Sequence, residues 1–147
     1  MFEGYSWFEV SNRDPRVVHL YARHYSSKKN GKSIKDWLAH GISANGHDVT
    51  MLTSDSKALW GWLEQQIRHD HQEGIQCYVF RNESNILSSV LINDAVAIAQ
   101  EYWPSQRLWT YVNPYKIDSP NPGYCFKVAG WKHKGQSKGG LHILELS

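Results

Sequence analysis

The chain has 147 residues, 41% of them hydrophobic and 20% charged, which suits one domain with its own core and is short for two. Its formal net charge of +2 is too small to imply nucleic acid by itself. No apolar run approaches the roughly 20 residues that span a bilayer, the N-terminus lacks a signal-peptide pattern, and Cys77 and Cys125 do not form a disulfide framework. We therefore expect a cytoplasmic protein without membrane contact.

The first organised segment that the pattern predicts is a helix beginning at Asp14. Asp14 is a good N-terminal cap, and Pro15 suits the first helical position. Apolar residues then recur at helical spacing, and the pattern stops near His24 or Tyr25. Residues 26–33 contain no apolar side chain and predict a flexible, lysine-containing loop.

The middle of the chain changes to strand-like patterns. Residues 33–42 fit either a short helix or a strand, whereas residues 48–53 alternate as a strand does. Residues 58–62 are expected to form the second arm of a hairpin with them. The polar stretch 63–74 has no clear form, and residues 77–80 are a compact β-prone run.

The clearest helix of the sequence follows that run. Apolar residues recur at helical spacing from Ile86 to Trp103, and Pro104 stops the pattern. Residues 108–112 follow as a strand. Together with residues 77–80, this order predicts a right-handed crossover between two parallel strands.

The C-terminal part predicts shorter elements. Residues 119–123 can start a short helix over residues 124–129. A strand over residues 131–133, a loop over residues 134–140 and a closing strand over residues 141–146 complete the chain.

This order of elements resembles the GNAT superfamily of N-acyltransferases. The likeness covers roughly residues 48–147 in topology and implies one α/β (α+β) domain over residues 1–147. Its expected architecture is a mixed central sheet that splays between two parallel strands, with helices on its flanks. In that family acyl-CoA enters the gap between the strands.

The turn after residues 77–80 is where the resemblance places the cofactor. In the family a Gly-rich loop and a helix N-terminus cradle the CoA pyrophosphate with backbone N–H groups. Residues 81–89 of this chain contain no glycine, and their Ser and Asn side chains offer other donors. The resemblance assigns acetyl-CoA, or another acyl-CoA, to Phe80, Arg81, Asn82, Ser84, Ser88, Ser89 and Asn121.

A second point of likeness is the segment NPGYCFKVAGW, residues 121–131. It resembles the family's closing motif, an Asn-led short helix followed by Gly and a bulky aromatic residue. In that motif a Tyr often protonates the leaving thiolate. Phe126 occupies the usual Tyr position, four residues before Gly130, so Tyr124 becomes the candidate acid.

A fainter likeness concerns His24, Tyr25, Ser26 and the basic loop after them. These residues resemble the start of the phage Mom-type DNA-modification proteins, which are GNAT-like in fold and alter adenine bases. The likeness implies DNA as a candidate acceptor.

Transfer to an amine requires a base that removes a proton and an acid for the leaving group. His24 is a candidate base, with a purely favourable contact to the helix dipole as the alternative. Glu83 follows a central strand and is a second candidate base, or else a solvated charge in an ordinary turn. The candidate substrate-binding residues are Tyr25, Ser26, Tyr111 and Asn113.

The segment that contains His69, Asp70 and His71 looks superficially metal-like. No third ligand accompanies the pair of histidines, so we expect a solvated loop and no metal site.

The sequence thus predicts a transferase that passes an acyl or related group from a small-molecule donor to an amino group. A nucleobase in DNA is one candidate acceptor, which Trp and Tyr side chains in the cleft would bind after it has flipped out of the base stack. The alternative is a non-catalytic small binding protein, one version of which binds nucleic acid, that keeps the fold without CoA chemistry. The glycine-free turn favours this alternative.

Overall fold

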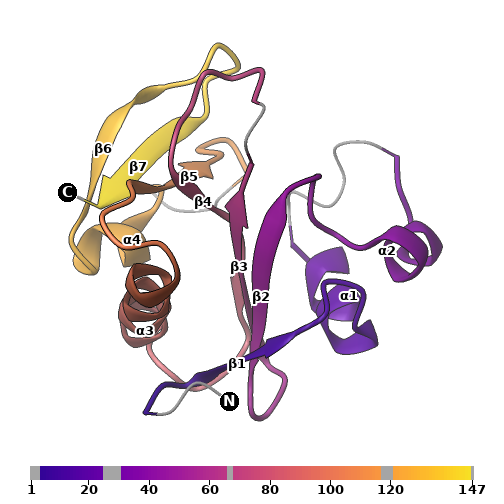
Figure 1. Cartoon of the computed structure of the whole chain (residues 1–147). Helices are drawn as coiled ribbons and strands as arrows, with labels where there is room; N and C mark the ends of the chain where they lie inside the picture. The colour runs from indigo at the N-terminus through magenta and orange to yellow at the C-terminus, as the bar shows by residue number, and fades with distance from the viewer. Residues whose placement is uncertain (1–3, 25–30, 66–67, 117–120, 147) are drawn as a thin grey trace.

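The computed structural model of the chain describes residues 4–24, 31–65, 68–116 and 121–146. These residues form one sheet of seven strands with four helices packed against it (Figure 1). In chain order the elements are β1 (Trp7–Val10), α1 (Pro15–Ala22), α2 (Ile34–His40), β2 (His47–Thr53), β3 (Ala58–Glu64), β4 (Ile75–Asn82), α3 (Ser88–Tyr102), β5 (Leu108–Val112), α4 (Tyr124–Val128), β6 (Trp131–Gln136) and β7 (His142–Leu146).

The strands lie in the order β1-β2-β3-β4-β5-β7-β6. Neighbouring strands are antiparallel except at the centre, where β4 and β5 run parallel with Ile75 opposite Leu108. Helix α3 connects these two strands, so the predicted strand–helix–strand crossover is confirmed. The mixed α/β fold class expected from the sequence is confirmed as well.

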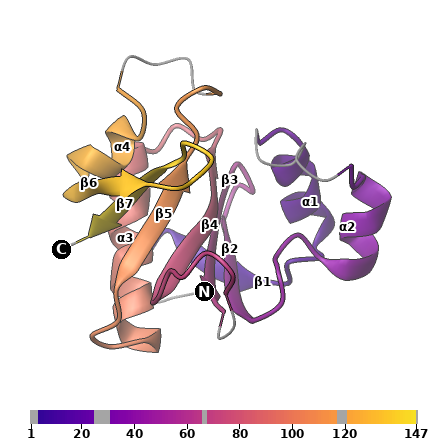
Figure 2. The same ribbon diagram turned by 90° about the horizontal axis from the view of Figure 1, so that it is seen from above.

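Helices cover both faces of the sheet. Helices α3 and α4 lie on one side, and α1 and α2 on the other (Figures 1 and 2). Each layer has its own hydrophobic cluster: Met51 and Trp60 belong to the cluster beneath α3, and Leu52 and Leu59 to the cluster beneath α1 and α2. Successive residues of β2 and β3 therefore point to opposite layers, as the pleat of a strand requires.

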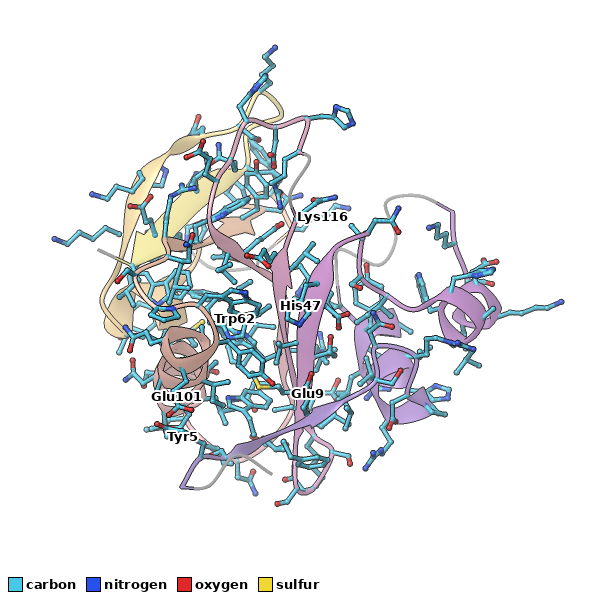
Figure 3. All side chains as sticks on the ribbon, viewed as in Figure 1. Tyr5, Glu9, His47, Trp62, Glu101 and Lys116 are labelled. Carbon is cyan, nitrogen blue, oxygen red and sulfur yellow. The ribbon has the colours of Figure 1, made fainter. Side chains whose placement is uncertain are left out.

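Tryptophan supplies much of the layer beneath α3. Trp7, Trp60 and Trp62 are fully buried, and Trp62 lies between β3 and α3 (Figure 3). Trp7 and Trp62 donate their indole N–H groups to the carbonyls of Leu91 and Ala95 in α3, each over 2.9 Å. Trp7 and Trp62 thus fix α3 to the sheet, since each buries a large ring and pairs its one donor with a carbonyl of the helix.

The helix signals of the sequence act as expected. The Asp14 side chain caps α1, and Pro15 is its first residue. Residues 33–42, which fitted two forms, contain the helix α2, because Ser33 and Asp36 form a capping box with Ser33 N donating to Asp36 Oδ2 over 2.7 Å. Helix α3 ends at Tyr102, two residues before the proline that was expected to stop it. Within the described part of the chain, no helix combines the length and apolar character needed to cross a bilayer.

One strand was missed, and several strand boundaries differ from the prediction. Strand β1 precedes the helix that the pattern placed first, and its four residues pair with β2. Strand β4 covers Ile75–Asn82 rather than residues 77–80, and β6 continues to Gln136, into the predicted loop. In each case the added residues pair with a partner strand. The sequence pattern of one segment does not show the stabilisation that comes from pairing with another strand.

Candidate active site

Strands β4 and β5 are paired over three residues and then part. The pairing ends at Cys77 opposite Thr110, where Thr110 Oγ1 donates to the Cys77 carbonyl over 2.8 Å. Beyond that point, β4 continues to Asn82 alongside β3, and β5 continues to Val112 alongside β7. The two strands thus open toward their carboxyl ends, as the family resemblance implied. Their facing edges offer backbone groups with which an extended ligand can pair.

A β-bulge in β4 accompanies this opening. The register of β4 against β3 shifts by one residue between Cys77 and Val79, which makes Tyr78 the extra residue. As a result, Tyr78 and Val79 both pack into the layer beneath α1 and α2, whereas Cys77 and Phe80 both pack into the layer beneath α3. A bulge bends its own strand, and here it lies where β4 leaves β5.

The Tyr78 side chain is fixed at both ends. A Cβ atom at Gly61 would collide with its ring, so the ring lies directly over that glycine. Its hydroxyl is 2.7 Å from Thr50 Oγ1, and Thr50 Oγ1 donates to Asp48 Oδ2 over 2.6 Å. Because Thr50 has one hydroxyl hydrogen, Tyr78 is the donor in its bond to Thr50. Burial raises the pKa of Tyr78 far above its usual value, so the phenol stays protonated.

A cavity of about 410 Å³ occupies the gap between the strand ends. Its walls come from residues 76–80 of β4, from residues 110–113 at the end of β5, and from residues 123–126 at the start of α4. His24, just beyond α1, and Asn121 also line it. Helices α1 and α4 lie on opposite sides of the strands (Figure 2), so a ligand in the gap can be reached from both faces of the sheet.

His24 is a buried histidine in the cavity wall, with 8% of its surface exposed. Its backbone N–H donates to the Tyr21 carbonyl over 2.8 Å, and its ring stacks on that of Tyr21 with centroids 6.4 Å apart. The carbonyl of the preceding residue, Arg23, accepts a hydrogen bond from Arg81 Nη1 over 2.9 Å. Contacts from both α1 and β4 thus hold this histidine in place.

Glu83 is held by two guanidinium groups. Arg23 donates to its carboxylate through Nε and Nη2 over 2.7 and 3.0 Å, and Arg81 donates through Nε over 2.9 Å. These contacts, with Arg23 the larger cause, lower the pKa of Glu83 to about 2. The carboxylate therefore connects the end of α1, and with it His24, to the end of β4.

The Asn82 side chain organises the turn between β4 and α3. Its Oδ1 accepts from the backbone N–H and the hydroxyl of Ser84 over 2.9 and 2.6 Å, and its Nδ2 donates to the Ile86 carbonyl over 2.8 Å and to Ser88 Oγ over 3.0 Å. The turn is thus closed by its own polar groups. Among the residues that the resemblance assigned to the cofactor, Phe80 and Asn121 line the cavity, whereas Arg81, Asn82, Ser84, Ser88 and Ser89 do not.

Tyr124 is the phenol on the α4 side of the cavity. It is the first residue of α4 and is 62% exposed. Gly123 precedes it with φ at +76°, and a Cβ atom there would collide with the Leu144 side chain, so only glycine lets α4 start this close to β7. Phe126, at the position where the family usually has its Tyr, is buried in the core.

The remaining predicted substrate-binding residues divide into two groups. Tyr111 and Asn113 line the cavity, and their contact with a substrate stays a prediction. Tyr25 and Ser26 lie outside the described residues, as does part of the basic loop that follows them.

Sequence reasoning missed a polar cluster beside the cavity. Arg68 donates to the Asp70 carboxylate through Nε and Nη2 over 2.8 and 2.6 Å, and the Tyr111 hydroxyl donates to it over 2.9 Å. Arg68 also donates to Gln76 Oε1 over 2.8 Å and stacks over the Trp109 ring. Asp70 is therefore not the solvated charge that was expected. Tyr111 lies 41 residues from Asp70 in the sequence, so no local pattern shows this contact. The one local signal of the cluster was an arginine two residues before Asp70.

The cluster controls two protonation states. The Arg68 guanidinium holds the pKa of Asp70 far below its usual range. Burial and the adjacent Asp70 charge raise the pKa of Tyr111 to about 12. Tyr111 also lines a second cavity, of about 390 Å³, between residues 69–72 and residues 136–139. The two cavities thus share one phenol in their walls.

The chain is similar to a known protein in its fold and not in its sequence. No protein-family model matches the sequence, and no curated protein matches it significantly. Among solved structures, the chain is similar to an acyl-CoA N-acyltransferase from Pseudomonas aeruginosa, with a TM-score of 0.55 and 11% identity over 96% of this chain and 98% of that chain. Taken with the parted central strands, this similarity shows that the chain has the fold of an N-acyltransferase.

Proposed function

We propose that this protein is an N-acyltransferase that moves an acyl group from a thioester donor to an amine. The observation that carries the proposal is the cavity between the parted strands, which both His24 and Tyr124 line. His24 follows α1 and Tyr124 begins α4, and these two helices lie on opposite sides of the sheet (Figure 2). The fold shared with an acyl-CoA N-acyltransferase supports it.

The gap suits the extended arm of a pantetheine thioester. Beyond Cys77 the open edge of β4 can pair with the amide groups of such an arm, in the manner of an added strand. The aromatic rings of Phe80 and Phe126 supply apolar wall, and the Asn121 side chain, which accepts from Lys127 Nζ over 2.7 Å, supplies a polar group. Acyl-CoA is the donor class that this arm implies, and the acetyl group in particular stays a prediction.

The two side chains divide the proton transfers. A bound acyl thioester supplies the electrophilic carbonyl carbon and the thiolate leaving group. His24 accepts the proton that the amine nitrogen loses as the C–N bond forms. Tyr124 donates its phenolic proton to the sulfur as the C–S bond breaks, and its 62% exposure lets it regain a proton from water.

Glu83, the second candidate base, takes a different part in this proposal. A carboxylate with a pKa near 2 is a poor proton acceptor at neutral pH. Its contacts with Arg23 and Arg81 instead support a positioning role, because they fix the backbone that leads to His24.

The acceptor amine would approach on the face of α1 and α2, past His24. The second cavity supports this direction, since it shares Tyr111 with the first and is bordered by the connection between β3 and β4. DNA as the acceptor has no support from the comparisons, so a nucleobase stays a prediction. Binding of duplex DNA that falls steeply with salt would favour it.

The decisive experiment is a transfer assay with a set of acyl thioesters and primary amines. Free thiol and the mass of the new amide are measured together, because aminolysis produces both in equal amounts. We expect enzyme-dependent amide with at least one pair. Donor binding without amide for any pair would contradict the proposal and favour the non-catalytic binding protein.

A further inference from the structure

We infer that the donor is recognised through its pantetheine-type arm and acyl group, and that the turn between β4 and α3 does not bind a nucleotide diphosphate. The inference rests on the proposed function. It identifies the donor class as thioesters of a pantetheine arm, whatever carries the far end of that arm.

The first observation is that three backbone donors of the turn already have partners within the protein. Glu83 N–H donates to the Lys57 carbonyl over 2.8 Å, Ser84 N–H donates to Asn82 Oδ1 over 2.9 Å, and Ile86 N–H donates to Ser84 Oγ over 3.2 Å. A diphosphate cradle needs several N–H groups aimed outward at one point. Here three of these groups point to partners within the protein.

The second observation is the side chains that cover the turn. Leu87 is 73% exposed and Ile86 is 36% exposed at the position where a diphosphate would have to touch the backbone. Their Cβ atoms and apolar branches prevent close approach, and they leave an apolar surface where phosphate oxygens would need donors.

The third observation is charge. The carboxylate of Glu83 lies in the turn and, with its pKa near 2, is ionised at neutral pH. The guanidinium groups of Arg23 and Arg81 are engaged with that carboxylate. A diphosphate would therefore have to displace an existing ion pair and lie close to a negative charge.

The fourth observation is the extent of the cavity. On β4 its wall ends at Phe80, and no residue from Arg81 to Ser89, all of them described, contributes to it. The space available to a ligand is thus the gap between the strands. The uncapped first turn of α3 still has outward N–H groups that one phosphate can meet, so the experiment addresses this turn directly.

The test compares three compounds on the intact protein: an acyl-CoA, the same acyl group on pantetheine, and 3′-phosphoadenosine 5′-diphosphate, which is the nucleotide diphosphate part of CoA. We expect kcat/KM for the two thioesters to agree within about tenfold, a difference of about 1.4 kcal/mol. We also expect the nucleotide diphosphate neither to inhibit the transfer nor to raise the melting temperature of the protein. Pantetheine without an acyl group should raise it, a readout that does not depend on turnover.

A variant addresses the helix end. Ser89→Asp adds a negative charge to the first turn of α3, where an acidic side chain also favours the helix, so folding should be retained. If a diphosphate bound to this turn, the substitution would lower kcat/KM for acyl-CoA at least about tenfold and would leave kcat/KM for acyl-pantetheine unchanged. We expect the ratio of the two donors to stay unchanged. Gln106→Glu, an exposed site beyond the other end of α3, is the control for the charge.

The outcomes separate the two proposals. Turnover of acyl-CoA without turnover of acyl-pantetheine, or stabilisation by the nucleotide diphosphate, would overturn this inference and leave the N-acyltransferase proposal intact. If no thioester is used and none raises the melting temperature, the proposed function fails, and the inference fails with it. Use of an arm carried on a protein would support the inference, because such an arm has no nucleotide.

Discussion

The phenol ring of Tyr78 lies against the α-carbon of Gly61 on the neighbouring strand, in the space that a side chain at position 61 would occupy. Gly61→Ala should therefore destabilise the protein. Because the ring is also held by Thr50, it cannot move aside freely, and overpacking of this kind costs about 1–3 kcal/mol. Urea unfolding measures the change.

Gly139→Ala is the matched control for that prediction. A Cβ atom at Gly139 would have Ser137 Oγ at 3.9 Å as its neighbour, an ordinary contact. The free energy of unfolding should change by less than about 0.5 kcal/mol. Equal effects of the two substitutions would show that Tyr78 does not occupy this position.

Replacing His24 should remove most of the transfer activity. In His24→Gln the side chain keeps a similar size and polarity but no longer accepts a proton, so kcat/KM should fall by about 10²–10⁴-fold while donor binding persists. His19→Gln, on the exposed face of α1, is the control and should retain activity. Full activity of the His24 variant would require another base.

Replacing Tyr124 should affect donors according to their leaving group. Tyr124→Phe removes the proposed acid, so turnover should fall with alkyl thioesters, whose thiolates need a proton, and much less with thiophenyl thioesters, whose thiolates do not. Tyr115→Phe, at a tyrosine that is 83% exposed, should change neither rate. An equal loss with both donor types would assign Tyr124 to binding rather than to proton transfer.

The Glu83 clamp predicts a stability difference that depends on pH. The pKa of Glu83 falls from an ordinary 4.5 to about 2 on folding, so folding favours its ionised form. The stabilisation is complete above pH 4.5 or so and is lost as the pH falls to about 2. The difference in unfolding free energy between the wild type and Glu83→Gln should shrink over this window.

Urea titrations between neutral pH and about pH 2 test that prediction. Glu73→Gln, at an exposed carboxylate before β4, is the control and should show no comparable trend. A Glu83→Gln difference that does not vary with pH would mean that Arg23 and Arg81 do not hold the carboxylate in solution.

Local signals predicted the elements that local chemistry determines. Asp14 and Pro15 fix the start of α1, and Pro104 follows the end of α3. The helical spacing of apolar residues from Ile86 to Trp103 identified the crossover helix that connects β4 to β5. The parting of those strands followed from the fold resemblance. Four of the predicted site residues line the cavity where the strands part: His24, Tyr111, Asn113 and Tyr124. Their chemical roles stay predictions.

What the sequence did not reveal depends on contacts between distant residues. Strand β1 is stabilised by pairing with β2, about 40 residues later. The bulge at Tyr78 interrupts the alternation of side chains that an unbroken strand over CYVF would have. Gly61, on another strand, leaves the space that the Tyr78 ring occupies. The partners of Asp70 likewise include Tyr111, far along the chain. No pattern within one segment contains such pairings.

The short seam between β4 and β5 also determines what sets the width of the gap. Three residue pairs join the two halves of the sheet, so their separation also depends on α3, whose fully buried Ala95 and Ala99 belong to a hydrophobic cluster with residues from both halves. Larger side chains at these alanines would move the halves apart from behind. In the proposed transferase, the range of acyl chain lengths would thus be adjustable from the core, without altering any residue that lines the cavity.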